Sequence, residues 1–395
     1  MDITKYLKPI IPSELGYYHS DTNMVMGDII RAYTPDDGLP TLARNALVLL
    51  GVGEDRGCVG NAGCALAPDE IRRYLYNLAP PTEENVTVLD YGNVIPGQTI
   101  EDTYYAVSDI VASVVGQGGT IVLLGGSQDI TFAAYKGFAN LHRQVNTVAI
   151  DPRFDLDNSD ELNARSWLRY LIMEELNYLF IHSTVGFQTY FVGQHFIRLM
   201  DQLKFDAFSL SEIQADMNRA EAQMRNSDIV SVDISAVRQS DAPGCGTPSP
   251  HGFYGEEFCR IMRFAGMSDK VSCLGLFDVN PTLDRGGQTA HMAAQGVWFF
   301  TEGFFNRLNE DPKAHPEQCK RFIVQLEEEG TAITFYKSKL SDRWWMEVPC
   351  NDEEKRDLYS EQFVLPCTYG DYKQALGNEI PNLWWTYYQR LNTPL

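Results

Sequence analysis

Short apolar segments alternate with helical patterns from residue 46 to residue 305, and this alternation constrains the fold more than any other feature. Continuous apolar runs are typical of strands that are buried on both faces, and helices must then connect them. The pattern predicts a three-layer αβα fold of the α/β class with a mostly parallel central sheet. The expected strands are 46–52, 86–90, 120–124, 147–151, 178–182, 229–233 and 272–277, and the expected helices are 101–116, 129–142, 161–175, 211–226, 253–266 and 287–305.

Three further regions surround this α/β domain, which we place at residues 45–305. Residues 1–44 form an N-terminal segment, 306–320 a polar connector, and 321–395 a C-terminal extension that packs on the main domain. In the extension, strand-like residues 322–326, 331–338 and 343–348 are separated by turn-rich Glu327–Gly330 and Lys339–Asp342, which predicts a β-meander before a helix at 380–391. Neighbouring Trp344 and Trp345 point to opposite faces of a strand. Either one of them packs on the main domain while the other contacts a partner, or both cover core surface.

Charge and composition exclude some classes of function. The formal net charge of −21 repels nucleic acid phosphates. We find no apolar run of the roughly 18 residues that a membrane span needs, and no signal peptide pattern at the start. The eight cysteines show no C-x-x-C pair and are expected to be reduced thiols, which favours a cytoplasmic location.

Charged or glycine-rich segments follow three of the expected strands. They are Gly125–Asp129, Asp151–Asp155 and Asp233–Ser235. The carboxyl ends of parallel strands lie at one edge of a sheet, where α/β proteins bind their ligands. We therefore expect these segments to converge on one cleft.

The order of these segments resembles the ureohydrolase superfamily, which includes arginase, agmatinase and formimidoylglutamase. The similarity spans residues 45–305, and the C-terminal portion is similar to the formimidoylglutamase-like arginase-family proteins of Bacteroidota. The residues that carry the resemblance are Gly51–Gly57, Asn61–Cys64, Ala67–Arg72, Asp90–Asn93, Gly125–Asp129, Asp151–Asp155, Ser231–Ser235, Ala242–Pro248 and Asp278–Pro281.

In active members of this superfamily, two histidines and four aspartates hold a pair of Mn²⁺ ions that activate water. The resemblance places Gln128, Asp151, Arg153, Asp155, Asp233 and Ser235 at those six positions. Arg153 cannot ligate a metal, because a guanidinium offers only donors. We expect Arg153 to form ion pairs with Asp155 or Asp233, and hence no metal cofactor. The alternative is Mn²⁺ or Mg²⁺ held weakly through Asp155 and Asp233.

Other candidates for chemistry are fewer. His251 follows the loop of the Thr247-Pro248 pair and is a candidate general base. Asp278 stands where the family has a glutamate that engages the substrate's guanidinium-like group. Cys245, in the same loop as His251, is a weaker candidate nucleophile.

Two functions remain open. The first is a non-catalytic binding or interaction protein that uses the C-terminal extension for a protein partner. The second is a hydrolase of a C–N bond in an amidine- or guanidine-type substrate, with one metal or none. A small cationic ligand and a homo-oligomer are compatible with either function.

Overall fold

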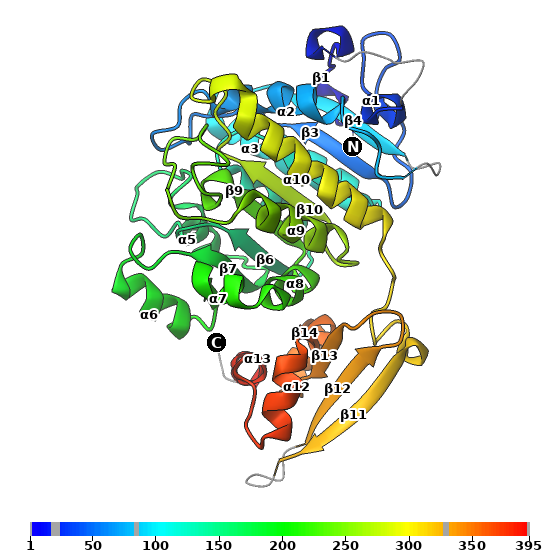
Figure 1. The fold of residues 1–395 in the computed structure, drawn as a ribbon, viewed down its shortest axis with the longest axis vertical. Helices are drawn as coiled ribbons and strands as arrows, with labels where there is room; N and C mark the ends of the chain where they lie inside the picture. Colours follow the sequence, from blue (N-terminus) through cyan, green and yellow to red (C-terminus); the bar gives the residue numbers. More distant parts are fainter. Residues whose placement is uncertain (1, 17–23, 83–86, 327–331, 393–395) are drawn as a thin grey trace.

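A computed structural model describes residues 2–16, 24–82, 87–326 and 332–392. In Figure 1 the α/β domain occupies the upper part of the molecule, and the C-terminal extension lies below it. The predicted arginase-like α/β architecture with an added antiparallel unit is confirmed.

The described part of the main domain contains a ten-stranded sheet in the order β1-β4-β3-β5-β10-β9-β6-β7-β8, with β2 paired to β4. The pairings are parallel except that of β1 with β4. The strands are β1 (Leu7–Lys8), β2 (Ile30–Ala32), β3 (Leu47–Gly51), β4 (Val88–Val94), β5 (Thr120–Leu124), β6 (Val145–Ile150), β7 (Leu179–Phe187), β8 (Asp206–Ser209), β9 (Ile229–Asp233) and β10 (Cys273–Phe277).

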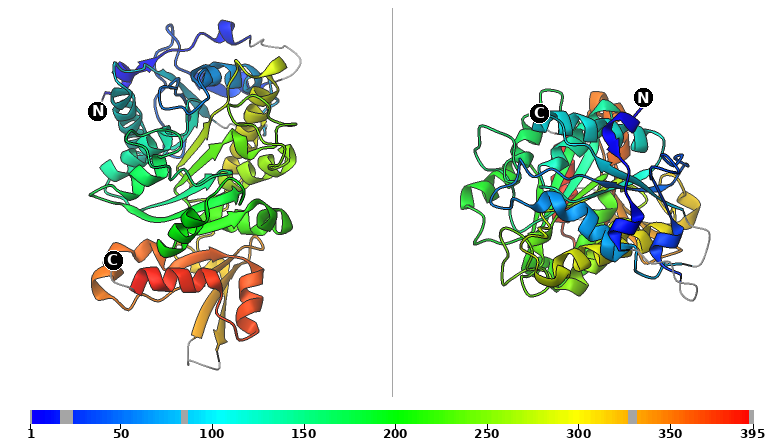
Figure 2. Two further views of the ribbon diagram at one scale, coloured as in Figure 1. Left: turned by 90° about the vertical axis from the view of Figure 1, so that its left-hand side faces the viewer. Right: turned by 90° about the horizontal axis from the view of Figure 1, so that it is seen from above.

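Helices cover both faces of this sheet, as Figure 2 shows. Alternate residues of each strand point to opposite faces, and the two apolar cores follow this rule. Val48 and Ile121 belong to the core with α3 and α4, whereas Leu49 and Val122 belong to the core with α2, α9 and α10. The helices of this domain are α1 (Met26–Ile29), α2 (Ala67–Leu75), α3 (Ile100–Gly116), α4 (Ile130–Asn140), α5 (Trp167–Ile172), α6 (Gln194–Gln202), α7 (Leu210–Ala215), α8 (Met217–Asn226), α9 (Gly255–Gly266) and α10 (Gln288–Phe305).

The C-terminal extension is a four-stranded antiparallel sheet with helices, in the order β11-β12-β13-β14. Both Trp344 and Trp345 are only 6% exposed, so both cover core surface. Arg225 of α8 donates hydrogen bonds to the backbone oxygens of Trp344 and Cys367, both at 3.1 Å, and thereby ties the two units together. The elements are β11 (Cys319–Gln325), β12 (Ala332–Ser338), β13 (Trp344–Glu347), α11 (Glu353–Leu358), β14 (Val364–Cys367), α12 (Tyr369–Leu376) and α13 (Asn382–Asn392).

Several predicted boundaries are wrong. The expected helix 211–226 is broken at Asp216, whose extended backbone (φ −149°) caps α8 through a bond to the Asn218 amide. The capping box that starts this region joins Ser209 to Glu212, and not residues 211 and 214. The expected helix 161–175 shortens to α5, and β14 and α12 were not predicted. The expected turn 327–330 lies outside the described residues. A search of the described helices finds none that is long and apolar enough to cross a membrane.

Candidate functional site

The loop after β5 shapes the floor of the cleft. Gly125 and Gly126 both adopt positive φ, 78° and 75°. A Cβ on Gly126 would lie 2.7 Å from the backbone oxygen of Val52, so only glycine fits this turn. The turn directs the next residues across the sheet edge, where the backbone N–H of Gln128 donates to Oδ2 of Asp278 at 3.2 Å.

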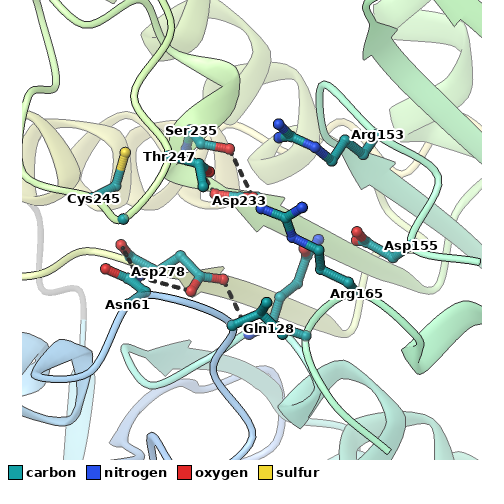
Figure 3. Close-up of a pocket in the computed structure, with 13 residues that line it drawn as sticks. Asn61, Gln128, Arg153, Asp155, Arg165, Asp233, Ser235, Cys245, Thr247 and Asp278 are labelled. Atoms are coloured by element: carbon teal, nitrogen blue, oxygen red, sulfur yellow. Dashed lines mark hydrogen bonds between the residues drawn. The ribbon is translucent and has the colours of Figure 1, made fainter. Parts of the chain in front are cut away.

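The three predicted segments do converge on one small cleft (Figure 3). Of the predicted positions, Gln128, Arg153, Asp155, Asp233, Ser235 and Asp278 line this cleft, and Asp151 lies buried behind it. The remaining lining residues are Val59, Asn61, Ala164, Arg165, Cys245, Gly246 and Thr247.

Asp151, Asp155 and Asp233 are held by short hydrogen bonds from neighbouring donors. Oδ1 of Asp151 accepts the backbone N–H of Arg153 at 2.6 Å. Oδ2 of Asp155 accepts the indole N–H of Trp167 at 2.9 Å. Both oxygens of Asp233 accept from Ser235, the backbone N–H at 2.7 Å and the hydroxyl at 2.8 Å. Ser235 therefore acts here as a donor that orients Asp233.

These carboxyl groups are forced together in a dry environment. Burial raises the pKa of Asp151 well above its ordinary value, and the charges of Asp155 and Asp233 raise it further. Burial raises the pKa of Asp155 to about 7. Burial also raises the pKa of Asp233, and its bonds from Ser235 oppose that shift. Such crowding is the situation that a bound cation relieves.

The predicted ion pairs of Arg153 are not formed. Its guanidinium lies over the ring of Phe191, 4.2 Å from the ring centroid, and in the described part of the chain it is not within 4.0 Å of a carboxylate. Phe191 belongs to the loop after β7, and cation–π stacking competes with ion pairing for a half-buried guanidinium. Arg153 acts on the cleft at longer range, since its charge still lowers the pKa values of Asp155 and Asp233.

Two polar residues that line the cleft, Asn61 and Arg165, and the buried Asp129 were not among the predicted site residues. Figure 3 shows the guanidinium of Arg165 directed into the cleft. Asn61 donates its side-chain N–H to Oδ1 of Asp278 at 2.9 Å. Asp129, which is fully buried, accepts the hydroxyl of Tyr104 at 2.5 Å, and burial raises its pKa to about 6. The quoted motifs contain Asn61 and Asp129, whereas Arg165 lies in a turn just before α5, inside the expected helix 161–175.

The two loop candidates have different outcomes. His251 is exposed and is not among the residues that line the described cleft, and its backbone oxygen accepts a bond from Gln188. Cys245 lines the cleft, but burial raises the pKa of its thiol to about 12, which leaves it protonated at neutral pH. His251 therefore lacks the position, and Cys245 the charge state, expected of a catalytic group.

The fold and the site together define the class of protein. A mostly parallel sheet with an aspartate-rich cleft at the carboxyl ends of its strands is an arginase-like α/β architecture. Residues 45–301 match the model of the Arginase family, so the chain belongs to this family.

Similar proteins are formimidoylglutamases. The chain is 24% identical to the formimidoylglutamase of Macrococcus caseolyticus over 261 residues. The matched region covers 64% of this chain and 83% of that protein. The crystal structure of formimidoylglutamase from Bacillus subtilis matches with a TM-score of 0.64 and 19% identity, and covers 73% of this chain and 95% of that one. Trypanosoma cruzi formiminoglutamase with Mn²⁺ matches with a TM-score of 0.62 and 20% identity, over 67% of this chain and 95% of that one.

The expectation that no metal cofactor is needed is wrong. The T. cruzi protein of the same fold is described with two Mn²⁺ ions. In this chain the carboxylates of Asp151, Asp155 and Asp233 are oxygen donors of the kind that Mn²⁺ and Mg²⁺ accept. Oδ2 of Asp151 is buried and accepts no hydrogen bond from any described residue, as expected of an atom placed for a cation.

The full two-metal ligand set does not fit these residues. Arg153 has no lone pair to donate, and the Ser235 hydroxyl is engaged with Asp233. As they stand, no three histidine, cysteine, aspartate or glutamate side chains of the described residues converge as a metal site. The residues present therefore do not reproduce the two-metal centre of the family.

Proposed function

We propose that this chain is a hydrolase of a C–N bond in a linear amidine, of the formimidoylglutamase type. The observation that carries the proposal is the cleft at the sheet edge, where Asp155, Asp233 and Asp278 face the same space. The 24% identity to formimidoylglutamases over most of their length supports this function better than the non-catalytic role that we also considered.

The acidic side chains of the cleft favour a cationic ligand. An amidine is protonated at neutral pH, and a cation is attracted to buried carboxylates in a site of low dielectric. The carboxyl group of Asp278 is fixed in position, because the side chain of Asn61 and the backbone N–H of Gln128 each donate a hydrogen bond to one of its oxygens. We assign to Asp278 the binding and orientation of the amidinium group.

A bound divalent cation would supply activated water by lowering its pKa. Asp151, Asp155 and Asp233 are the residues that would hold this cation. Trp167 and Ser235 would keep their carboxylates in place, because each donates a hydrogen bond to one of them.

The test is hydrolysis by the purified protein with added Mn²⁺, measured as formamide from formimidoylglutamate or urea from arginine and agmatine. We expect turnover of the formimidoyl substrate, and a loss of about 100-fold or more in Asp278→Asn. The control Asp206→Asn, which changes a carboxyl on β8, keeps full activity. Absence of turnover on all three substrates by metal-loaded protein would refute the proposal.

A non-catalytic binding role is the second candidate, and the arginine at position 153 favours it. Tight binding of an amidine without turnover would support that role. A cytoplasmic location is proposed from the eight unpaired thiols. A protein partner for the C-terminal extension, a homo-oligomer and the Bacteroidota subgroup stay predictions.

A further inference from the structure

A second pocket lies over helices α3, α4 and α5, away from the cleft at the sheet edge. Its volume is about 680 Å³, which falls in the range of pockets that hold small molecules. Among the described residues none lines both this pocket and the cleft, so the proposed hydrolysis does not use it. The pocket is lined by Arg56, Ile100, Glu101, Tyr104, Tyr105, Ser108, Phe132, Lys136, Asn140, Asp160, Glu161, Leu162, Tyr170 and Glu174.

Four aromatic rings dominate the apolar part of this lining. Tyr104 is 8% exposed and Tyr105 is 71% exposed, and both belong to α3. Phe132 of α4 and Tyr170 of α5 are half-buried. In the part of the chain that the structure describes, none of these rings stacks on another aromatic ring. Rings without an aromatic partner can receive an apolar group, or a cation over their faces.

Three of the lining side chains are held by hydrogen bonds, so the pocket is formed before any ligand enters. The hydroxyl of Tyr104 donates to the buried Asp129 at 2.5 Å. The amide of Asn140 donates to the hydroxyl of Ser108 at 3.1 Å. The hydroxyl of Tyr170 donates to a backbone oxygen at 3.2 Å. A preformed pocket loses little conformational entropy when it binds.

The basic side chains of the pocket are already neutralised. Nε of Arg56 donates to Glu54 at 2.9 Å, and another of its nitrogens donates to the backbone oxygen of Thr99 at 3.1 Å. Nζ of Lys136 donates to Glu174 at 2.6 Å. These ion pairs leave neither cation free to attract an anion.

The remaining acidic side chains of the pocket have no such partners. Glu101, Asp160 and Glu161 are exposed, and none of them lies within 4.0 Å of a basic group among the described residues. Three carboxylates without counter-ions give the pocket a negative potential, which attracts a cation. A second copy of this chain, with its net charge of −21, would bring further negative charge to the same place.

We propose that this pocket binds a small organic ammonium ion with an aromatic body, of the phenylalkylamine type. The rings of Tyr104, Tyr105 and Phe132 receive the apolar body, and the carboxylates hold the ammonium group. Size and charge together decide the occupant, because an anion lacks a free cation here and a neutral molecule leaves the carboxylates unpaired. The site is independent of amidine hydrolysis in the cleft.

The experiment is a ligand-observed NMR titration of the full chain at low ionic strength, with phenethylammonium as the probe. We expect a Kd on the order of 0.1–1 mM, which is typical of a ligand of this size. The neutral analogue 2-phenylethanol, in which a hydroxyl replaces the ammonium group, should bind at least about tenfold more weakly. Methylammonium, which lacks the aromatic body, should show no saturable binding.

Exposed side chains of the pocket supply variants that do not threaten the fold. Tyr105→Ala, and the double variant Glu101→Gln with Glu161→Gln, should each weaken probe binding by about fivefold or more. Tyr369→Ala is the matched control, because Tyr369 is 53% exposed and lies on α12 of the extension. Asp278→Asn should also leave probe binding unchanged, which separates this pocket from the acidic cleft.

Equal affinity for phenethylammonium and 2-phenylethanol would overturn the proposal, since the carboxylates would then play no part. Loss of probe binding in Asp278→Asn would place the probe in the cleft and would also overturn it. Sedimentation velocity tests the remaining occupant. A dimer of the parent chain that Tyr105→Ala converts to monomer would show that a second copy covers the pocket, against the proposal.

Discussion

Arg72 of α2 offers the sharpest test of how this fold is held together. Its side chain is completely buried, as is that of its partner Asp90 on β4. Nε and one terminal nitrogen of Arg72 donate to the two oxygens of Asp90 at 2.8 and 2.9 Å. The other donors reach Asn93 at 2.6 Å and the backbone oxygen of Gly92 at 2.8 Å. The pair therefore joins the first crossover helix to the sheet.

We expect Arg72→Met to lower the free energy of unfolding by about 3–5 kcal/mol, the range for removing one partner of a buried ion pair. Methionine keeps most of the volume of the arginine side chain. The loss of stability therefore arises from the Asp90 carboxylate, which no longer has a cationic partner, and from the oxygens of Asn93 and Gly92, which lose their donor. Because whole domains are stable by only about 5–15 kcal/mol, this single change removes a large fraction of the total.

Urea denaturation at pH 7, followed by tryptophan fluorescence, measures the effect. Arg73→Met is the matched control on the same helix, since Arg73 is 53% exposed and pairs with Glu70 at 3.3 Å. Such a surface pair contributes about 0.5 kcal/mol or less. A loss below about 1 kcal/mol in Arg72→Met would show that the carboxylate is relieved by protonation or water, and the reasoning would fail.

Two other predictions concern buried groups. His182 is fully buried between the hydroxyls of Thr147 and Thr184, and burial lowers its pKa to about 3. The unfolded chain takes up this proton below pH 6.5 and the folded chain does not. The contribution of the buried, neutral His182 to the free energy of unfolding is therefore fully present above pH 6.5. Below that pH the free energy of unfolding falls by about 1.4 kcal/mol per pH unit, down to about pH 3. His182→Gln should flatten this acid limb in denaturation curves, and an unchanged limb would contradict the assignment. Cys245→Ser should keep full amidine hydrolysis, and iodoacetamide at pH 8 should leave the activity of the parent protein intact, because burial keeps the Cys245 thiol protonated. A large loss of activity would instead make Cys245 a reacting group.

The central strands could be predicted because their environment is uniform. Residues 120–124 and 229–233 coincide with β5 and β9, since each apolar run is buried on both faces and ends at a glycine pair or an aspartate. Asp216 breaks the expected helix 211–226 because its side chain competes for a backbone N–H, which helical spacing does not reveal. β14 was missed because it is a short edge strand that contains Pro366.

The candidate site was predicted in position but not in orientation. Strand ends locate Asp155 and Asp233, since the sheet brings them to one edge. The direction of Arg153 depends on Phe191, which comes from a different loop, and no local pattern encodes that contact. Arg165 was missed for the same reason, because only the folded loop brings it to the cleft.

The backbone at Asp278 has a consequence for which substitutions this position accepts. Its φ of +64° lies in the left-handed region, which aspartate, asparagine and glycine tolerate better than other residues. A glutamate at this position, as the resemblance gives for active relatives, would carry about 1 kcal/mol of backbone strain here. Asp278→Glu would therefore strain the turn as well as lengthen the side chain. Asparagine tolerates the same backbone conformation, so Asp278→Asn tests the carboxylate without disturbing the turn.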